Sequence, residues 1–331
     1  MPLVSIVVPC YNEQNTIGLL LAAIYQQSFD RSSMEVIIAD GLSEDLTREI
    51  ISEFQKAHPD LKIYIVDNQR RTIPSGLNEA IQKSGGDYIV RLDAHCEPYP
   101  DYIERCIEAL SNGDGDNVGG VWEIQPGGTG WVARSIAAAS AHPLGVGDAR
   151  YRLGGNAQVV DTVPFGSFKR DLYDRVGLYN EDLLTNEDYE LNVRIRKAGG
   201  RVWLDPRIRS RYIARPNFTQ LGRQYWRYGY WKGRMLRNYP GTIRWRQLMP
   251  PVFVAGILVL SMLAIWFAMA RWLLSAIIGV YLAILFIAGI LIALSKRDAS
   301  MIIGLPLAIC VMHFSWGSGF LGNFLIKPSI Q

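Results

Sequence analysis

Three side chains that could bind a metal ion or an anionic ligand stand where predicted strands end. Asp93 and His95 lie in GDYIVRLDAHCEP (86–98), directly after a short apolar run, and Asp40 ends the apolar run MEVIIAD (34–40). Carboxylates accept hydrogen bonds and bind hard cations, and imidazole is a common ligand of transition metals. These residue types at strand ends predict a polar cleft that binds a metal ion, an anion or both.

A further set of carboxylates occurs in NEDYE (186–190), at the start of a predicted helix that ends at Gly199 and Gly200. Glu187 and Asp188 are its central members. Acidic residues in a first helical turn often only complement the helix dipole. The alternative is a general base that removes a proton from a reacting hydroxyl. Spacing alone leaves both roles open.

The segments that must position these side chains alternate between strand and helix. Strand-like runs span residues 3–8, 34–40, 61–67 and 87–93, and helical patterns span 15–27, 45–57 and 74–83. Strict alternation predicts an α/β fold with a Rossmann-like, mostly parallel sheet flanked by helices. Ligands of such sheets bind beyond the carboxyl ends of the strands. The polar residues expected at that edge are Asn12, Glu13, Asp40, Asp93 and His95.

The same pattern argues against several other kinds of site. The turn after the first run reads PCYNEQNT and has no glycine before Gly18, so a dinucleotide-binding turn is not indicated, and a Walker loop is absent too. The cysteines, at positions 10, 96, 106 and 310, are irregularly spaced. Neither a disulfide framework nor a zinc site is therefore expected.

The C-terminal part of the chain has the composition of a membrane domain. No Asp or Glu occurs between Asp205 and Asp298 of the 331-residue chain. Apolar runs of about the twenty residues needed to cross a bilayer lie at 252–270, 272–294 and 301–326. They predict three transmembrane helices, with buried core helices as the alternative. The first two runs almost touch at Arg271, where a tight hairpin or a partly inserted pair would also fit.

Basic residues predict the orientation of these helices. They crowd before the first run and between the second and third, at Arg234, Arg237, Arg244, Arg246, Lys296 and Arg297. Such residues mark the cytoplasmic side, and no signal peptide is indicated at the N-terminus. We therefore expect a multi-pass protein of the plasma (inner) membrane. The predicted parts are a cytoplasmic domain at 1–215, an interfacial amphipathic segment of aromatic and basic residues at 216–250, and a membrane domain at 251–331.

Several motifs over residues 1–230 together resemble the family 2 inverting glycosyltransferases of the GT-A fold. They are VSIVVPCYNEQNTI, ADGLSEDLT, GDYIVRLDAHC and TNEDYELNVRIRKAGGRV, in the order and spacing of that family. RRTIPSGLNEAI and GVGDARYR are more similar to its ExoA-like, succinoglycan-synthesis branch. The resemblance implies a GT-A domain, a hexosyltransferase and a nucleotide-sugar donor.

The resemblance also implies which residues bind the donor. In the family, the residue at Asp40 contacts the nucleotide base, although an aspartate before Gly41 is also a common turn former. Arg71 or Arg70 would lie by the diphosphate, with a solvated loop charge as the alternative. The complete implied set for the nucleotide sugar is Pro9, Tyr11, Asn12, Glu13, Asp40, Arg71 and Asp93.

The residues Asp93 to His95 correspond to the family's DxD signature, which binds ribose and, through a divalent cation, the diphosphate. His95 stands where the family has a second Asp. Imidazole suits Mn²⁺ better than Mg²⁺, because Mg²⁺ strongly prefers oxygen ligands. We therefore predict a divalent cation on Asp93 and His95, with Mn²⁺ favoured over Mg²⁺. The alternatives are a histidine that only ends the strand, with Glu97 or a carboxylate from elsewhere in the chain as the metal ligand.

On the acceptor side, the family's ED motif places the catalytic base at Asp188, with Glu187 beside it. The processive QxxRW motif, which lies near acceptor and diphosphate, is approximated with Tyr for Trp by Gln224, Arg227 and Tyr228. The surrounding segment QYWRYGYWKGR (224–234) also has the composition of an interfacial helix, with rings and arginines at headgroup depth. Both roles are compatible.

These features predict transfer of a sugar from a nucleotide-diphosphate sugar, by preference a UDP-sugar, to a lipid-linked saccharide in exopolysaccharide or surface-glycan assembly. The expected partners are donor, acceptor and membrane, whereas nucleic acid is not expected beside membrane helices. Three alternatives stay open. They are transfer to polyprenyl phosphate itself, processive polysaccharide synthesis, and a non-catalytic, membrane-tethered nucleotide-binding module.

Overall fold

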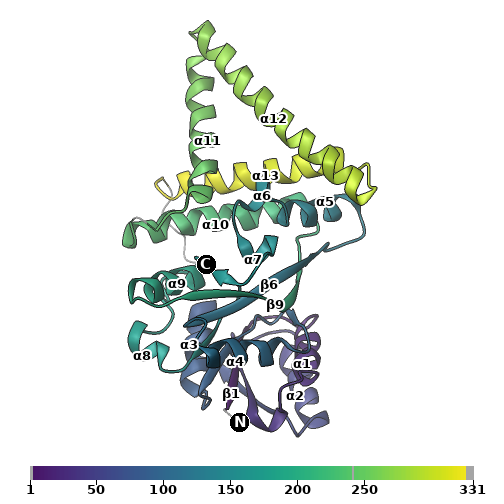
Figure 1. The fold of residues 1–331 in the computed structure, drawn as a ribbon, viewed down its shortest axis with the longest axis vertical. Helices are drawn as coiled ribbons and strands as arrows, with labels where there is room; N and C mark the ends of the chain where they lie inside the picture. Colours follow the sequence, from purple (N-terminus) through teal and green to yellow (C-terminus); the bar gives the residue numbers. More distant parts are fainter. Residues whose placement is uncertain (1–2, 241, 326–331) are drawn as a thin grey trace. The chain divides into compact units, whose positions relative to one another are not determined.

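The computed structural model describes residues 3–240 and 242–325, and the chain divides into two compact units. The first unit comprises Met1–Glu123 and Arg150–Tyr212, and the second comprises Ile124–Ala149 and Ile213–Gln331. The first contains the sheet and the second is largely helical (Figure 1). The predicted boundary at 215 lies close to the start of the second unit's larger segment. That residues 124–149 also belong to the second unit was not predicted.

The first unit alternates strands and helices as expected. Its strands are β1 (Val4–Cys10), β2 (Met34–Asp40), β3 (Lys62–Asp67), β4 (Tyr88–Arg91), β5 (Glu97–Pro98), β6 (Asn117–Gln125), β7 (Gln158–Val159), β8 (Ser167–Lys169) and β9 (Val202–Ile213), the ends of β6 and β9 reaching the second unit. Its helices are α1 (Ile17–Tyr25), α2 (Thr47–Ala57), α3 (Ile73–Lys83), α4 (Tyr102–Asn112), α7 (Arg150–Leu153), α8 (Leu172–Val176) and α9 (Glu187–Lys197), with a 3₁₀ turn at Arg31–Ser33. The strands and helices predicted before residue 93 all form.

The sheet is mixed. The strand order is β3-β2-β1-β4-β8-β6-β9-β5, with β7 beside β9. Strands β3, β2, β1 and β4 are parallel, whereas β8 is antiparallel to both β4 and β6, and β5 and β7 are antiparallel to β9. The predicted parallel sheet is therefore its first half, and later strands add an antiparallel half.

Burial on both faces explains why the first strands are almost wholly apolar. On β1, Ile6 and Val8 belong to the core that α1 and α4 cover, while Val7 belongs to the opposite core with Leu77 of α3 and Leu191 of α9. Side chains alternate along a strand, so a strand covered on both faces must be apolar throughout. Polar residues are left for the strand ends.

The register brings those ends together. Cys10 of β1 is level with Asp40 of β2, which is level with Asp67 of β3. The loops that follow the three strands therefore begin side by side at one edge of the sheet, as the parallel arrangement predicts.

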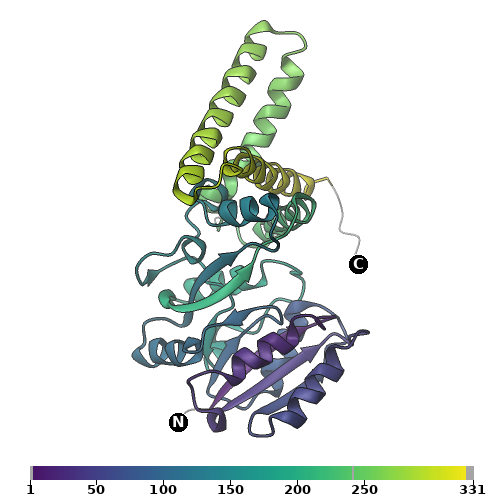
Figure 2. The same ribbon diagram turned by 90° about the vertical axis from the view of Figure 1, so that its right-hand side faces the viewer.

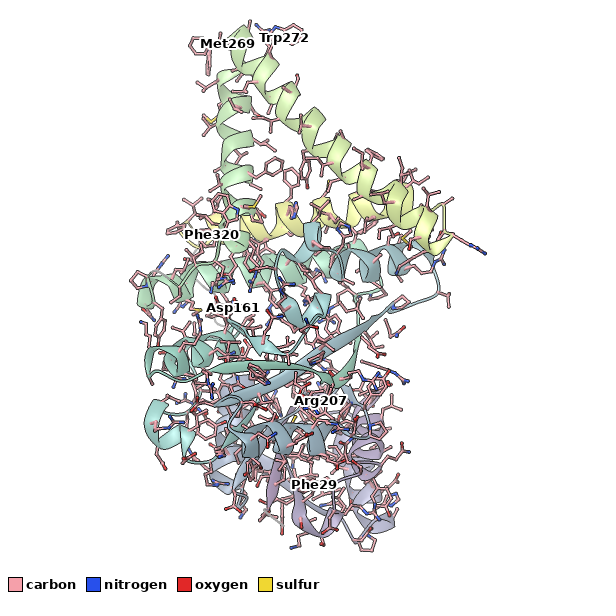
Figure 3. All side chains as sticks on the ribbon, viewed as in Figure 1. Phe29, Asp161, Arg207, Met269, Trp272 and Phe320 are labelled. Carbon is pink, nitrogen blue, oxygen red and sulfur yellow. The ribbon has the colours of Figure 1, made fainter. Side chains whose placement is uncertain are left out.

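The second unit contains α5 (Trp131–Ser140), α6 (Pro143–Val146), α10 (Phe218–Asn238), α11 (Trp245–Leu263), α12 (Ala268–Lys296) and α13 (Met301–Gly322). Within the described residues, α11, α12 and α13 are the helices long and apolar enough to cross a membrane. Helices α11 and α12 form an antiparallel hairpin (Figure 2). Met269 and Trp272 are exposed near its tip (Figure 3).

The helix ends differ from the predicted runs in two respects. Helix α11 begins at Trp245, before the predicted run at 252–270 and inside the predicted interfacial segment at 216–250. The connection between α11 and α12 lies at residues 264–267, so Arg271 falls inside α12 and not at the join. The connecting residues AIWF are themselves apolar, so a hydropathy pattern does not reveal the turn. The predicted end of the third run, at 326, lies outside the described residues.

Candidate active site

The loops after β1 and β2 are joined by hydrogen bonds at the sheet edge. The backbone N–H of Asn12 donates to Ser43 Oγ over 2.8 Å, and the N–H of Glu44 donates to Asn12 Oδ1 over 2.9 Å. Asn12 has a left-handed φ of 53°, which asparagine tolerates better than most residues. Asn12 thus fixes the shape of the loop in which Pro9, Tyr11 and Glu13 also lie.

Asp40 is completely buried at this edge. It accepts hydrogen bonds from Ser43 N (3.0 Å), Ser43 Oγ (2.5 Å) and Arg48 Nε (2.5 Å). Arg48 also reaches Asp67 Oδ1 over 2.5 Å. These contacts are those of the turn-forming role, because they organise the loop after β2. The predicted contact with a nucleotide base stays a prediction.

The two arginines after β3 point to different partners. Arg71 lies over the half-exposed ring of Tyr11, with 5.5 Å between guanidinium carbon and ring centroid, and its Nη1 is 3.2 Å from Glu44 Oε1. Arg70 instead pairs with Glu181 over 2.5 Å. Arg71 is therefore the one that lies beside the predicted donor loop.

Glu13, in the loop after β1, and His95, in the turn after β4, lie beside each other. Glu13 Oε1 is 3.0 Å from His95 Nδ1, and Thr16 Oγ1 donates to Glu13 Oε2 over 2.5 Å. Burial by itself raises the pKa of Glu13, but the hydrogen bonds from His95 and Thr16 outweigh it and lower the pKa below its ordinary value. The pair thus presents an anionic carboxylate to a half-exposed imidazole.

Arg91 contacts carboxylates from two different parts of the site. It is buried at the end of β4, and its Nη2 donates to Asp93 Oδ1 over 3.1 Å and to Glu187 Oε1 over 3.0 Å. Its guanidinium carbon lies 5.9 Å from the centroid of the Tyr179 ring. One guanidinium therefore joins the predicted donor-binding carboxylate to the acidic pair at the start of α9.

The acidic pair Glu187 and Asp188 is held in a poorly solvated place. Glu187 is buried, Asp188 is half-buried, and the N–H of Tyr189 donates to Asp188 Oδ1 over 2.7 Å. Burial raises the pKa of both carboxyls, and for Glu187 to about 7, although the charge of Arg91 opposes the rise. A carboxyl with a raised pKa is a better proton acceptor at neutral pH.

The residues present fit a divalent cation that is bound partly by the protein and partly by the phosphate groups of a substrate. Asp93 is partly exposed, and within the described residues its Oδ2 accepts no hydrogen bond. No group of three or more His, Cys, Asp or Glu side chains in the described part of the chain could enclose a metal. Mg²⁺ and Mn²⁺ sites that bind phosphate substrates commonly use one or two protein ligands plus phosphate oxygens and water. Asp93 and His95 match that pattern.

The predicted acceptor residues Gln224, Arg227 and Tyr228 all lie on α10, in the second unit. Gln224 Nε2 donates to the Tyr228 hydroxyl over 3.0 Å, which ties the two along one helix face. Their role toward an acceptor is not tested by this arrangement and stays a prediction.

Sequence reasoning missed three residues that organise the site: Arg91, Arg48 and Tyr179. Arg91 looked like a strand residue, and its charge inside an apolar run was the available signal.

Arg152 was also missed. It is buried, with its guanidinium carbon 4.8 Å from the centroid of the Trp122 ring and 5.2 Å from that of Tyr212. The motif GVGDARYR (145–152) thus ends in an arginine that packs against aromatic rings.

Several known proteins are similar to this chain in sequence. The sequence model described as Glycosyl transferase family 2 matches residues 5–177. The chain is 31% identical over 323 residues to the succinoglycan biosynthesis protein ExoA of Rhizobium meliloti, covering 97% of this chain and 94% of that protein. It is 28% identical to dolichyl N-acetyl-alpha-D-glucosaminyl phosphate 3-beta-D-2,3-diacetamido-2,3-dideoxy-beta-D-glucuronosyltransferase of Methanococcus voltae, covering 98% of each.

Solved structures share the fold. The mannosyltransferase PcManGT of Pyrobaculum calidifontis, in complex with GDP-Man and Mn²⁺, aligns with a TM-score of 0.63 at 20% identity, covering 94% of this chain and 87% of that one. TarS of S. aureus (residues 1–349, with UDP) aligns with a TM-score of 0.51 at 14% identity, covering 97% and 92%. At these identities the alignments show the fold alone.

Proposed function

We propose, from the premise that this chain belongs to glycosyl transferase family 2 and is a glycosyltransferase, that it moves a sugar with inversion from a nucleotide-diphosphate sugar to a lipid-linked saccharide. The observation that carries the proposal is the bridge made by Arg91. Through it, the residue predicted to hold the donor diphosphate and the residue beside the predicted base belong to one site.

The donor side is formed by loops after three parallel strands. Asn12, Ser43 and Asp40 give these loops a fixed shape, and Arg71 and Tyr11 provide a cation and an aromatic face next to them. A planar base can stack on such a ring, and a guanidinium binds phosphate oxygens. UDP is our preferred nucleotide because of the family resemblance, while structural neighbours bind GDP-Man or UDP.

On the reaction side, Asp188 would take the proton from the acceptor hydroxyl as that oxygen attacks the anomeric carbon opposite the leaving group. Its partly buried position favours the proton-accepting role. Asp93 and His95 would hold a divalent cation, which offsets the negative charge that develops on the leaving diphosphate. Mn²⁺ is our preferred ion, because imidazole is a softer ligand than Mg²⁺ favours.

A lipid-linked saccharide acceptor is supported by the relatives and by the apolar helices. The Methanococcus relative carries in its name a sugar joined to dolichyl phosphate as its acceptor. Membrane anchoring would confine enzyme and acceptor to one surface and raise their effective concentration. We propose that the protein is a multi-pass protein of the plasma (inner) membrane with its catalytic unit in the cytoplasm, and that it acts in exopolysaccharide or surface-glycan assembly.

Membranes that carry the full chain test the activity. They are incubated with a panel of radiolabelled nucleotide sugars, with and without Mn²⁺, and label in the lipid fraction is counted. Asp188→Asn should lower transfer roughly 10²–10⁴-fold, the usual contribution of general-base catalysis, while binding of the nucleotide measured by calorimetry is retained.

Asp182→Asn is the matched control, because Asp182 is an exposed aspartate on the connection that precedes α9, whereas Asp188 lies in the first turn of that helix. It should leave transfer unchanged. If Asp188→Asn keeps activity within about tenfold, a barrier change of about 1.4 kcal/mol, Asp188 is not the base. Label that enters no lipid with any donor would contradict the lipid-linked acceptor, and a long labelled polymer would indicate a processive synthase.

A further inference from the structure

Helix α13 lies directly against α10 along much of its length. The two helices run side by side in both ribbon views (Figures 1 and 2). A Cβ at Gly229 of α10 would come within 2.2 Å of Trp316 O, and a Cβ at Gly319 of α13 within 2.2 Å of Trp226 O. Two glycines thus let the backbones touch, and such close packing fixes the two helices to each other.

Polar contacts hold both ends of α13 to the helices that cover it. Just before its start, Asp298 Oδ2 pairs with Arg134 Nε of α5 over 2.9 Å. At its end, Arg237 Nη2 of α10 donates to Asn323 O over 2.7 Å. α13 is therefore a part of the α5 and α10 layer from one end to the other.

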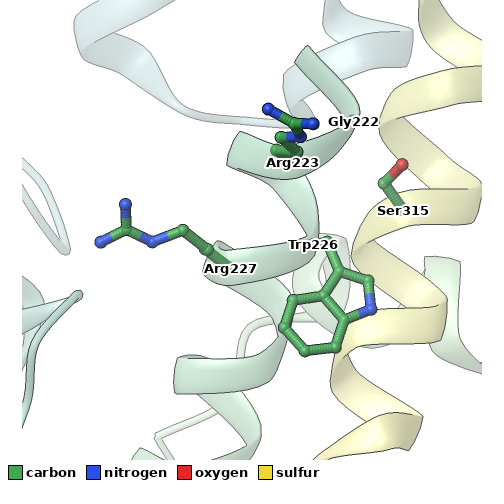
Figure 4. Close-up of a pocket in the computed structure, with 5 residues that line it drawn as sticks. All are labelled: Gly222, Arg223, Trp226, Arg227 and Ser315. Atoms are coloured by element: carbon green, nitrogen blue, oxygen red, sulfur yellow. The ribbon is translucent and has the colours of Figure 1, made fainter. Parts of the chain in front are cut away.

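The covering helices carry exposed arginines. Arg223 and Arg227 of α10 are exposed, as is Arg134 of α5. Figure 4 shows Trp226 on the side of α10 toward α13 and the Arg227 guanidinium pointing away from Ser315 of α13. If α13 crossed the bilayer, α10 would enter the hydrocarbon with Arg223 and Arg227, which is strongly unfavourable for an exposed guanidinium.

Part of the surface of α13 is apolar and exposed, although the ends of α11 and α12 also pack against this helix, with the ring centroids of Phe253 and Phe314 5.8 Å apart. Ile303, Leu307 and Phe314 are exposed, and their spacing places them on one face of the helix. In the most apolar stretch of α13, 44% of the residues are buried within the protein, against 17% in α11 and 22% in α12. A layer with arginines on one side and apolar residues on the other is typical of helices that lie in a membrane interface.

We propose that α10 and α13 together lie in the plane of the membrane interface, and that only the α11–α12 hairpin crosses the bilayer. The partner of this layer is the lipid surface, with anionic headgroups near the α10 arginines and acyl chains against the apolar face of α13. The C-terminus then lies on the same side as the start of α11, whereas three crossings would place it on the opposite side. This inference does not depend on sugar transfer.

Spin labels test the orientation of α13. In the full-length protein with Cys310→Ser, nitroxides are attached after Ile303→Cys, Leu307→Cys, Phe314→Cys or Ser318→Cys, all on one face of α13. Depth in liposomes with anionic lipid is measured from collisions with oxygen and with a nickel chelate. The four depths should agree, without a maximum at the centre of the helix.

Helix α12 provides the matched control. Labels after Trp272→Cys, Val280→Cys, Ile287→Cys and Leu294→Cys lie on one face of that helix, at positions that are exposed in the structure. They should be deepest in the middle and shallow at both ends. A similar depth profile along α13 would overturn the proposal, and so would a flat profile along α12, because the hairpin would then not cross.

Reporter fusions test the side of the C-terminus independently. Green fluorescent protein fused after residue 331 should fluoresce and alkaline phosphatase at the same place should be inactive, as expected for the cytoplasm. Fusions after Ile265, at the hairpin tip, should give the opposite result. Active phosphatase at the C-terminus would mean an odd number of crossings and would contradict the proposal.

Discussion

At the scale of single residues, Arg91 is the group on which the site depends. Removing one partner of a buried ion pair usually costs about 3–5 kcal/mol, because the other charge stays buried. We expect Arg91→Met to lower the free energy of unfolding of the catalytic unit by about that amount. Chemical denaturation, followed by fluorescence, measures it.

Arg91→Lys keeps the positive charge but loses the planar guanidinium, which donates hydrogen bonds to Asp93 and Glu187 at the same time. It should fold, bind the nucleotide and lower kcat more than it raises KM, because Asp93 and Glu187 would no longer be held by one group. Arg105→Lys is the control, since Arg105 makes ion pairs with Asp101 and Glu108 on the partly exposed surface. Equal effects of the two Lys variants would show that Arg91 has no special positioning role.

The Glu13–His95 pair predicts how metal binding responds to substitution. A carboxylate that orients a metal-ligating imidazole typically contributes about 10–100-fold to metal affinity. Glu13→Gln should therefore weaken Mn²⁺ binding by about tenfold or more, and His95→Ala should weaken it further. Mn²⁺ titration monitored by electron paramagnetic resonance measures the free ion directly.

Mg²⁺ provides the comparison, because the binding of Mg²⁺ should depend less on the His95 imidazole than the binding of Mn²⁺ does. Transfer with Mg²⁺ should fall less in His95→Ala than transfer with Mn²⁺. If the enzyme turns over equally with both ions, and His95→Ala changes neither, then the histidine only ends its strand.

At the scale of elements, the antiparallel half of the sheet depends on a close approach between β6 and β9. A Cβ at Gly120 would lie 1.7 Å from Ile208 O, so alanine has no space there. Gly120→Ala should destabilise the catalytic unit by roughly 1–3 kcal/mol or more, the range for overpacked cores. Thermal unfolding followed by circular dichroism checks this value.

Gly18 provides the control for that substitution. It lies in α1, and an added Cβ would make an ordinary 3.5 Å contact with Ile50. Gly18→Ala should be neutral or stabilising by up to about 1 kcal/mol, because alanine favours the helix. A Gly120→Ala protein as stable as the Gly18→Ala protein would show that the strands can separate without cost.

At the scale of the whole molecule, the catalytic unit is discontinuous in sequence. Residues 124–149 belong to the second unit, yet the rings of Trp122 and Tyr151 at the two ends of this excursion are 5.0 Å apart. A short Gly/Ser linker from Glu123 to Arg150 can therefore replace it. We expect the joined chain, 1–123 and 150–212, to be soluble and to bind nucleotide.

The uninterrupted fragment 1–215 is the comparison. It keeps α5, whose buried face packs against α13 in the full chain, and that face would be uncovered. It should require detergent to remain in solution, because a large exposed apolar patch promotes association. Sedimentation of both fragments without detergent distinguishes them, and a soluble, monodisperse 1–215 fragment would contradict this division of the chain.

Much of the fold was available from the sequence because the deciding patterns are local. Apolar strands and amphipathic helices up to Asp93 form where their periodicity predicts, and the glycosyltransferase assignment follows from motifs that end those strands. Apolar helices at the C-terminus were likewise predicted from length and composition. Each of these features depends on neighbouring residues, which a sequence shows directly.

Tertiary structure decided the features that depend on distant partners. Arg91 meets Glu187 across 96 positions of sequence, and the antiparallel pairing of β8 with β4 has no local signal. Helix α13 is as apolar as a membrane-spanning segment, but its glycines and polar ends pack against α10 and α5. Hydropathy measures only how favourably a segment leaves water, and it does not say whether protein or lipid receives it.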